Sequence, residues 1–137
     1  MRLLLSAALA AAALAGPALA DGDAAKGENE FKKCKACHEI VADDGTEIMK
    51  GGKTGPNLYG VIGRAVGSTD FNYGDSIKAA GEEQGLVWDE EMLVAYLADP
   101  KAWLQEVTGD AAAKSKMTFK LTKGGEDVAA YLASVAQ

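Results

Sequence analysis

Cys34-Lys35-Ala36-Cys37-His38 joins the two cysteines of the chain to its single histidine within five residues. Two cysteines separated by two residues and followed by histidine form the pattern in which a c-type haem is attached. In that chemistry the two thiols add to the vinyl groups of the haem, and the histidine ligates the iron. We therefore predict one covalent haem c, with Cys34 and Cys37 as its attachment points and His38 as an iron ligand.

Three other interpretations of the two cysteines are weaker. A disulfide between Cys34 and Cys37 is conceivable in an oxidising compartment. A thioredoxin-like redox pair has the same spacing, but the strand-then-helix setting that supports it is missing here. A structural zinc site needs four ligands, and His38 is the only histidine available to join the two thiols.

Residues 1–20 have the composition of a secretory leader. Arg2 supplies a positive start, residues 3–16 are apolar and rich in Ala and Leu, and Ala18-Leu19-Ala20 places small residues before a cleavage point. The apolar run is shorter than the roughly 20 residues that a membrane-spanning helix needs, so an uncleaved anchor is the weaker alternative. We predict export to the periplasm and cleavage after Ala20, with residues 21–137 forming one domain.

The chain is acidic, with a formal net charge of −6. Nucleic acids and anionic membrane surfaces attract clustered Lys and Arg, so this balance argues against both as main partners. No internal repeat or long linker divides the chain after the leader, and we expect a monomer with one compact domain. The aromatic content supports only a modest core, to which a large internal cofactor would add.

Three helices are expected from capping residues and apolar spacing. The first covers residues 23–33, with Asp23 as its N-cap, and leads directly into the cysteine motif. The second covers residues 89–99 and must stop there because Pro100 follows. The third begins after Gly124-Gly125 and carries an apolar stripe at helical spacing.

The long segment 43–85 is dense in Gly, Asn and Asp, so turns should dominate it, with a possible short helix at residues 75–80. No run alternates apolar and polar residues over several positions, so we expect little or no sheet. The pattern predicts an all-α fold in which helices and Gly-rich loops wrap around the haem. A loop-rich connection of this length needs such an internal group to pack against.

The iron has a second axial position, which without another histidine could be filled by Met, Lys or water, or stay open. Met117 is the best candidate, because it is the one soft apolar side chain in a very basic loop and lies far enough along the chain to reach the opposite haem face. Met49 is only eleven residues beyond His38. Met92 falls on the apolar stripe of the second helix, where a core role is expected.

The order of these motifs resembles that of class I cytochrome c. The motif 34–38 at the end of the first helix, the loop Gly55-Pro56-Asn57-Leu58, the central Trp88 and the loop Lys116-Met117-Thr118-Phe119 occur in the family's order over residues 22–135. The chain looks most like the bacterial periplasmic cytochrome c2 and c-550 group. Four-helix cytochromes of the c-prime kind share only the haem-attachment motif, and they carry it near the C-terminus.

The resemblance implies roles for further residues. The carbonyl of Pro56 would accept a hydrogen bond from Nδ1 of His38, which fixes the tautomer of the ligand. Tyr96 would lie beside the sulfur of Met117. The first helix would cross the third where Gly27 and Phe31 meet Tyr131. Four more residues would serve the haem propionates and the neighbouring loop: Tyr73 and Trp88 as hydrogen-bond donors, Arg64 as a compensating charge and Ser115 as the hydroxyl that ties down the propionate side of the ligand loop.

One departure from the short mitochondrial members is visible. Residues 104–113 are extra before the ligand loop, and they are expected to form an extended loop.

With both axial positions filled, no substrate can reach the iron, so the resemblance implies a soluble one-electron carrier and not an enzyme. A thioether ligand favours ferrous iron and raises the potential. Such a carrier suits a shuttle from a cytochrome bc-type complex to a photosynthetic reaction centre or a terminal oxidase, in photosynthesis or respiration. The alternative is a small haem peroxidase or gas-binding haem protein with a displaceable sixth ligand.

Lysines cluster around the haem-attachment motif and the ligand loop, although the whole chain is acidic. In the implied fold they would ring the exposed haem edge and dock transiently with acidic faces of membrane complexes. A simpler interpretation is an ordinary solvated surface. The proposed docking set is Lys32, Lys33, Lys35, Lys114, Lys116, Lys120 and Lys123, and the acidic residues expected away from it are Glu82, Glu83, Asp89, Glu90, Glu91 and Asp99.

Overall fold

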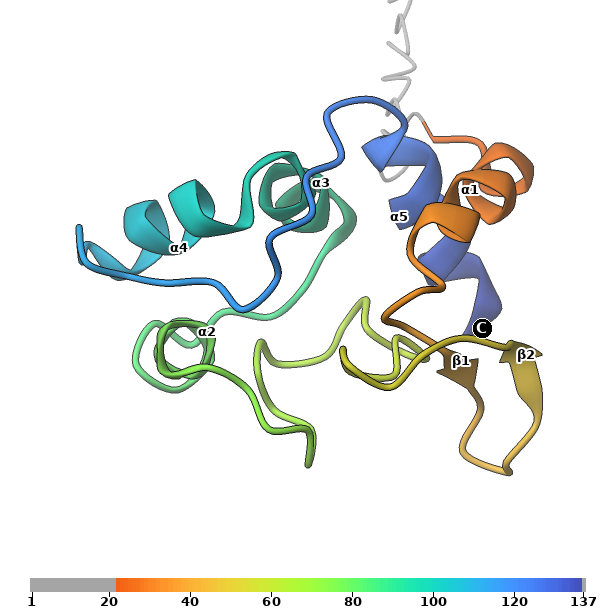
Figure 1. Cartoon of the computed structure of the whole chain (residues 1–137), viewed down its shortest axis with the longest axis horizontal. Coiled ribbons are helices and arrows are strands. Elements are labelled where there is room, and N and C mark those ends of the chain that lie inside the picture. The colour runs from red at the N-terminus through yellow and green to blue at the C-terminus, as the bar shows by residue number, and fades with distance from the viewer. Residues whose placement is uncertain (1–21, 137) are drawn as a thin grey trace, which may run out of the picture.

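The computed structural model describes residues 22–136, which form short helices joined by long loops (Figure 1). The leader and its expected cleavage after Ala20 lie outside the described residues. In chain order the elements are α1 (Ala24–Glu30), η1 (Phe31–Lys33, a 3₁₀ helix), β1 (Ile40–Val41), β2 (Glu47–Met49), α2 (Asp75–Glu82), α3 (Glu90–Ala98), α4 (Pro100–Thr108) and α5 (Gly125–Val135). Within residues 22–136, no helix is both long enough and apolar enough to span a bilayer.

Helices α1 and α5 cross at one end of the molecule, as the resemblance to class I cytochrome c implied. The carboxylate of Asp23 caps α1 by accepting from the amides of Ala25 and Lys26 at 2.9 and 3.2 Å. Gly27 allows close contact between the helices, because a Cβ there would overlap the carbonyl of Asp127. The ring of Phe31 packs against that of Tyr131, with centroids 5.8 Å apart. This crossing holds the segment that leads into Cys34.

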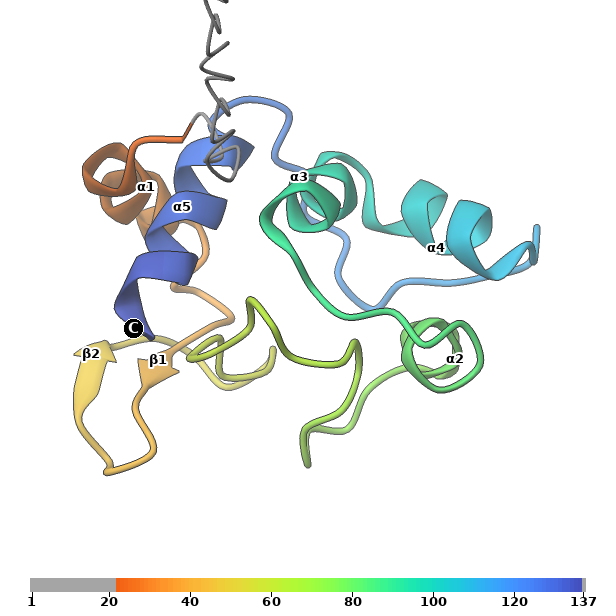
Figure 2. The same cartoon turned by 180° about the vertical axis from the view of Figure 1, so that it is seen from behind.

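Helix α4 is a correction to the sequence analysis, which expected an extended loop over residues 104–113. The same Pro100 that ends α3 occupies the first turn of α4, where its missing N–H costs nothing. Asp99 caps the new helix through the amide of Ala102 at 3.0 Å, and Gly109 ends it in a left-handed conformation with φ 67°. Only the residues after Thr108 form an irregular connection. Both views place α4 at the end of the molecule opposite α1 and α5 (Figures 1 and 2).

Helix α4 is attached to the core by an aromatic cluster. The Trp103 ring stacks on Trp88 with centroids 5.2 Å apart and planes inclined by 22°. Tyr96 meets both indoles edge-on, at 5.1 and 5.5 Å. All three side chains are buried, so the expected helices α3 and α5 and the unexpected α4 share one core.

The other expectations hold. The possible short helix at residues 75–80 exists and extends to Glu82 as α2. The sheet content in the described part of the chain is one two-stranded antiparallel ribbon, in which β1 pairs with β2. Loops account for most of residues 43–85, in agreement with an all-α fold that contains almost no sheet.

Candidate haem site

The motif 34–38 forms a tight turn directly after η1. The amides of Cys37 and His38 both donate to the carbonyl of Cys34, at 3.2 and 2.9 Å. Both thiols are free; Cys34 is half-buried and Cys37 is exposed. Burial raises the pKa of the Cys34 thiol to about 11, and the nearby Lys33 ammonium offsets this only partly.

A glycine-rich segment lies against this turn. The amides of Gly52 and Gly55 donate to the carbonyls of Lys35 and Cys37, both at 2.8 Å. A Cβ on Gly51 or Gly52 would overlap the backbone of the motif, and one on Gly55 would overlap the imidazole of His38. Glycine is therefore required for this backbone to cover the turn so closely.

His38 is oriented by the residue that follows Gly55. Its Nδ1 lies 2.8 Å from the carbonyl oxygen of Pro56. A carbonyl can only accept, so Nδ1 carries the proton and Nε2 keeps the lone pair that can bind a metal. Burial lowers the pKa of the ring, and the bond to Pro56 opposes that shift. At neutral pH the imidazole is thus neutral, as an iron ligand must be.

Asn57 attaches the loop that contains Pro56 to strand β1. Its side-chain oxygen accepts from the amide of Val41 at 3.0 Å, and its Nδ2 donates to the carbonyl of Val41 at 2.8 Å. The Arg64 guanidinium donates to the carbonyls of Asn57 and Tyr59 at 3.2 and 3.3 Å. The residues on both sides of Pro56 are consequently fixed, and with them the direction of its carbonyl.

The side chains predicted to serve the propionates form two groups. Arg64 and Tyr73 lie close together: burial lowers the pKa of Arg64, and Tyr73 favours the charged guanidinium. The Tyr73 hydroxyl is within 2.6 Å of Thr69 Oγ1. Trp88 belongs instead to the aromatic cluster with Tyr96.

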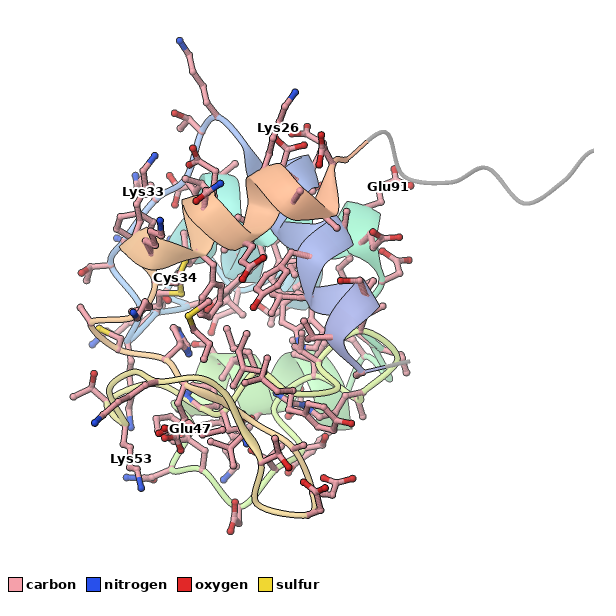
Figure 3. All side chains as sticks on the ribbon, turned by 90° about the vertical axis from the view of Figure 1, so that its right-hand side faces the viewer. Lys26, Lys33, Cys34, Glu47, Lys53 and Glu91 are labelled. Atoms are coloured by element: carbon pink, nitrogen blue, oxygen red, sulfur yellow. The ribbon has the colours of Figure 1, made fainter. Side chains whose placement is uncertain are left out.

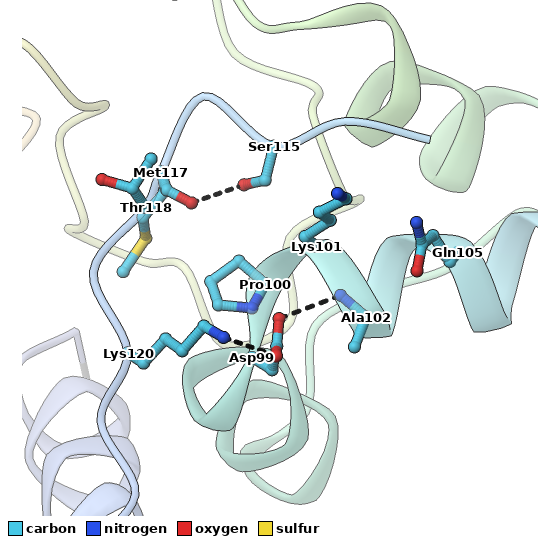
Figure 4. Close-up of a pocket in the computed structure, with 9 residues that line it drawn as sticks. All are labelled: Asp99, Pro100, Lys101, Ala102, Gln105, Ser115, Met117, Thr118 and Lys120. Carbon is cyan, nitrogen blue, oxygen red and sulfur yellow. Dashed lines mark hydrogen bonds and ion pairs between the residues drawn. The ribbon is translucent and has the colours of Figure 1, made fainter. Parts of the chain in front are cut away.

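The loop that carries Met117 is tied down on both sides. On one side the Lys116 ammonium donates to the carbonyl of Asn72 at 3.0 Å. On the other, the amide of Leu121 donates to the carbonyl of Leu97 at 2.7 Å. Within the loop, the Ser115 hydroxyl donates to the carbonyl of Met117 at 2.8 Å (Figure 4). Met117 is half-buried and packs against the core.

Tyr96 connects this loop to the core. Burial raises the pKa of its hydroxyl, and the hydroxyl of Ser115 opposes the shift, so Ser115 and Tyr96 lie close to each other. The other methionines lie elsewhere: Met49 is at the end of β2, opposite Ile40, and Met92 packs against the core from α3.

Comparison with known proteins identifies the family. The chain is 60% identical to cytochrome c2 of Rhodobacter capsulatus over 138 residues, covering 100% of both chains. It is 56% identical to cytochrome c-551 of Roseobacter denitrificans over 136 residues, covering 99% of this chain and 97% of the relative. The solved structure of Rhodobacter capsulatus cytochrome c2 matches with a TM-score of 0.82 and 62% identity, covering 85% of this chain and 100% of that one. No protein-family model matches the chain.

The chain belongs to the cytochrome c2 and c-550 family. Its fold is that of class I cytochrome c. It is an electron carrier with one covalent c-type haem, and it is not an enzyme. The residues present fit that cofactor, because both thiols are free, the Nε2 atom of His38 keeps its lone pair, and Gly55 has no side chain that would displace the imidazole. Among residues 22–136 no group of three or more His, Cys, Asp and Glu side chains could hold a separate metal ion.

The lysines predicted to dock partners of this cytochrome are not equivalent. Lys33 pairs with Glu30 at 2.7 Å, Lys32 donates to Asn29 at 3.0 Å, and Lys116 is bonded as described above. In the described part of the chain, the ammonium groups of Lys35, Lys114 and Lys123 have no hydrogen bond or ion pair. Lys33 and Cys34 lie on one side of the molecule and Glu91 on the other (Figure 3).

The expectation for Asp99 was wrong. It was placed among acidic residues away from the lysines, but its carboxylate pairs with Lys120 at 2.8 Å. The reason is that Asp99 begins α4, which the sequence analysis did not predict, and the start of α4 faces the Met117 loop (Figure 4).

Sequence reasoning missed four residues that build the site. Gly55 was noted only as part of a loop motif, and its contact with His38 depends on how segments far apart in sequence fold together. Asn57 had no assigned role. Trp103 and Asp99 were missed with α4, although the Asp99-Pro100 pair and Gly109 were available as helix start and stop signals.

Proposed function

We propose that Cys34 and Cys37 form the two thioether bonds to the haem and that His38 and Met117 are the axial ligands of its iron. The observation that carries this proposal is the orientation of His38, whose Nδ1–H is held by Pro56, on the same turn as two free thiols. When bound, the haem supplies a one-electron change between ferric and ferrous iron.

The residues of the chain tune that change. The Pro56 carbonyl makes the imidazole of His38 more electron-rich by accepting its proton. The Met117 thioether favours ferrous iron, as does the apolar surrounding of Tyr96 and Trp88. Arg64, Tyr73 and Trp88 would bind the propionates, while Ser115 holds the backbone of Met117. With His38 and Met117 as its ligands, the iron would have no open position for a substrate.

The proposed redox partners follow from the lysines near the haem site and from the predicted export of the protein. After cleavage at Ala20 the carrier would take electrons from a cytochrome bc-type complex and deliver them to a photosynthetic reaction centre or a terminal oxidase. It would dock through the lysines near Cys34 and the Met117 loop, because opposite charges steer the encounter and only brief contact with the membrane complexes is needed.

Two measurements test this proposal. Mass analysis of the denatured periplasmic protein should show a polypeptide that retains one haem and begins at Asp21. An optical redox titration should show a single one-electron wave, and the reduced protein should be oxidised by a reaction centre or oxidase. Haem lost to acidic organic extraction would contradict the thioether assignment, and absence of reduction by any bc-type complex would contradict the proposed donor.

A further inference from the structure

Asp99 is the single residue between α3 and α4, and it is part of both helix ends. It closes α3 and caps α4 with an extended backbone at φ −160° and ψ 94°. Its Oδ1 atom accepts from the amide of Ala102 at 3.0 Å. One carboxylate oxygen is thus committed to α4, which fixes the orientation of the whole carboxylate.

The second oxygen of Asp99 reaches the Met117 loop. Oδ2 accepts from Lys120 Nζ at 2.8 Å, and Lys120 follows Met117 by three residues (Figure 4). The hydrogen bond to Ala102 and the bond to Lys120 both hold the pKa of Asp99 below its usual value. The carboxylate is therefore charged at neutral pH and connects the helix to the loop.

The space between the start of α4 and the loop is not filled by packing. A pocket of about 340 Å³ lies there, lined by residues of α4 and by Ser115, Met117, Thr118 and Lys120. Two polar contacts tie the residues after Met117 to the end of α3 and the start of α4. They are the ion pair between Asp99 and Lys120 and the hydrogen bond from the amide of Leu121 to the carbonyl of Leu97. The bridge joins the loop directly to the start of α4, so its loss should raise the rate of local opening in the loop before it affects the rest of the core.

We propose that Asp99 is a positioning residue for Met117. Through Lys120 it holds the loop closed and so limits how readily the Met117 sulfur leaves the iron. This inference rests on the proposed function, in which Met117 is the axial ligand.

The two contacts of Asp99 can be separated by substitution. Asp99→Asn keeps a good helix cap, because asparagine also accepts from the amide of Ala102, but it removes the charge that holds Lys120. Lys120→Gln removes the same pair from the loop side and leaves the cap untouched. Lys26→Gln is the matched control: it removes one lysine from an exposed pair with Asp23, 4.0 Å apart on α1, far from the Met117 loop in the sequence.

The experiment measures how fast imidazole replaces Met117 in the purified ferric holoprotein, through loss of the thioether-to-iron absorption band. At low ionic strength Asp99→Asn and Lys120→Gln should each raise the rate by about two- to fivefold, the range expected for an exposed ion pair. The double variant should be no faster than either single variant, because both remove one interaction. Added salt should raise the rate of Met117 replacement in the wild-type protein and leave the rate of Asp99→Asn almost unchanged. The midpoint of denaturant unfolding should shift no more than in Lys26→Gln.

Three results would overturn the proposal: rates equal to that of Lys26→Gln, additive effects in the double variant, or a rate increase matched by an equal loss of global stability. The failure of the proposed function looks different. In that case the wild-type protein would lack the thioether band, and Met117→Ala would bind imidazole no faster than the wild type, so Met117 would not be the ligand that Asp99 positions.

Discussion

At the scale of single residues, Gly55 decides whether His38 can take its place. A side chain at this position would overlap the imidazole ring, and overpacking of this kind costs about 1–3 kcal/mol. We expect Gly55→Ala to lower the free energy of unfolding of the holoprotein by that amount in denaturant titrations. Gly74→Ala is the control: its Cβ would meet only the flexible chain of Lys116 at ordinary contact distance, and the only expected loss comes from placing alanine, a poorer cap than glycine, at the N-cap of α2. A loss at Gly55 no larger than the loss at Gly74 would refute the argument.

The second residue to test is Met117, the proposed second ligand of the iron. Met117→Ala should open the sixth position, lower the midpoint potential and let cyanide or imidazole bind readily, because the thioether that favours ferrous iron is gone. Met49→Ala should change none of these, since Met49 is placed at the end of β2. Redox titration and ligand-binding spectra check both variants. If the Met49 variant lost the thioether band and the Met117 variant kept it, the ligand assignment would be wrong.

At the scale of elements, α4 depends on one aromatic anchor. Trp103 is 7% exposed and stacks on Trp88, and truncating a buried tryptophan to alanine costs about 3–5 kcal/mol. We expect Trp103→Ala to reduce the unfolding free energy by this amount. Val87→Ala, at a side chain that is 48% exposed, should change it by no more than about 0.5 kcal/mol. A small effect at Trp103 would mean that α4 contributes little to the core.

At the scale of the whole molecule, net charge and local charge oppose each other. The chain is acidic, whereas lysines surround the haem-attachment motif and the Met117 loop. If local charge guides docking, the bimolecular rate with a bc-type complex should fall as salt shortens the Debye length below about 10 Å. Lys35→Glu should slow the reaction roughly two- to tenfold at low salt. Lys35 is preferred to Lys116 for this test, because the Lys116 ammonium also holds the carbonyl of Asn72.

Lys26→Glu is the matched control for docking, since it changes the total charge equally at a position outside the proposed docking set. Stopped-flow rates over a range of ionic strength separate the two explanations. A rate that rises with salt in the wild-type protein, or that falls equally in both variants, would show that total charge controls the encounter.

Local signals predicted much of this molecule. Asp23 and Asp89 were identifiable as helix starts because a cap bonds to amides two or three residues away. The cysteine motif was readable because its chemistry needs a fixed spacing of neighbouring residues. The end of α3 was also correct, but the same Pro100 was taken only as a stop. Pro100 also begins α4, and whether a second helix follows it depends on the burial of Trp103.

The sequence by itself determined the cofactor class, the three principal helices and the crossing of α1 with α5, because each rests on residues close together in the chain or on an order of motifs that matches one family. The tertiary structure alone decided that Gly55 abuts His38, that Trp103 stacks on Trp88, and that Asp99 pairs with Lys120 instead of lying apart from the lysines. These contacts join residues 15 to 21 positions apart, and no spacing rule connects them. They exist because distant chain segments pack around one core. The side chains that fit together and the charges that pair there are neighbours in space but not in the sequence.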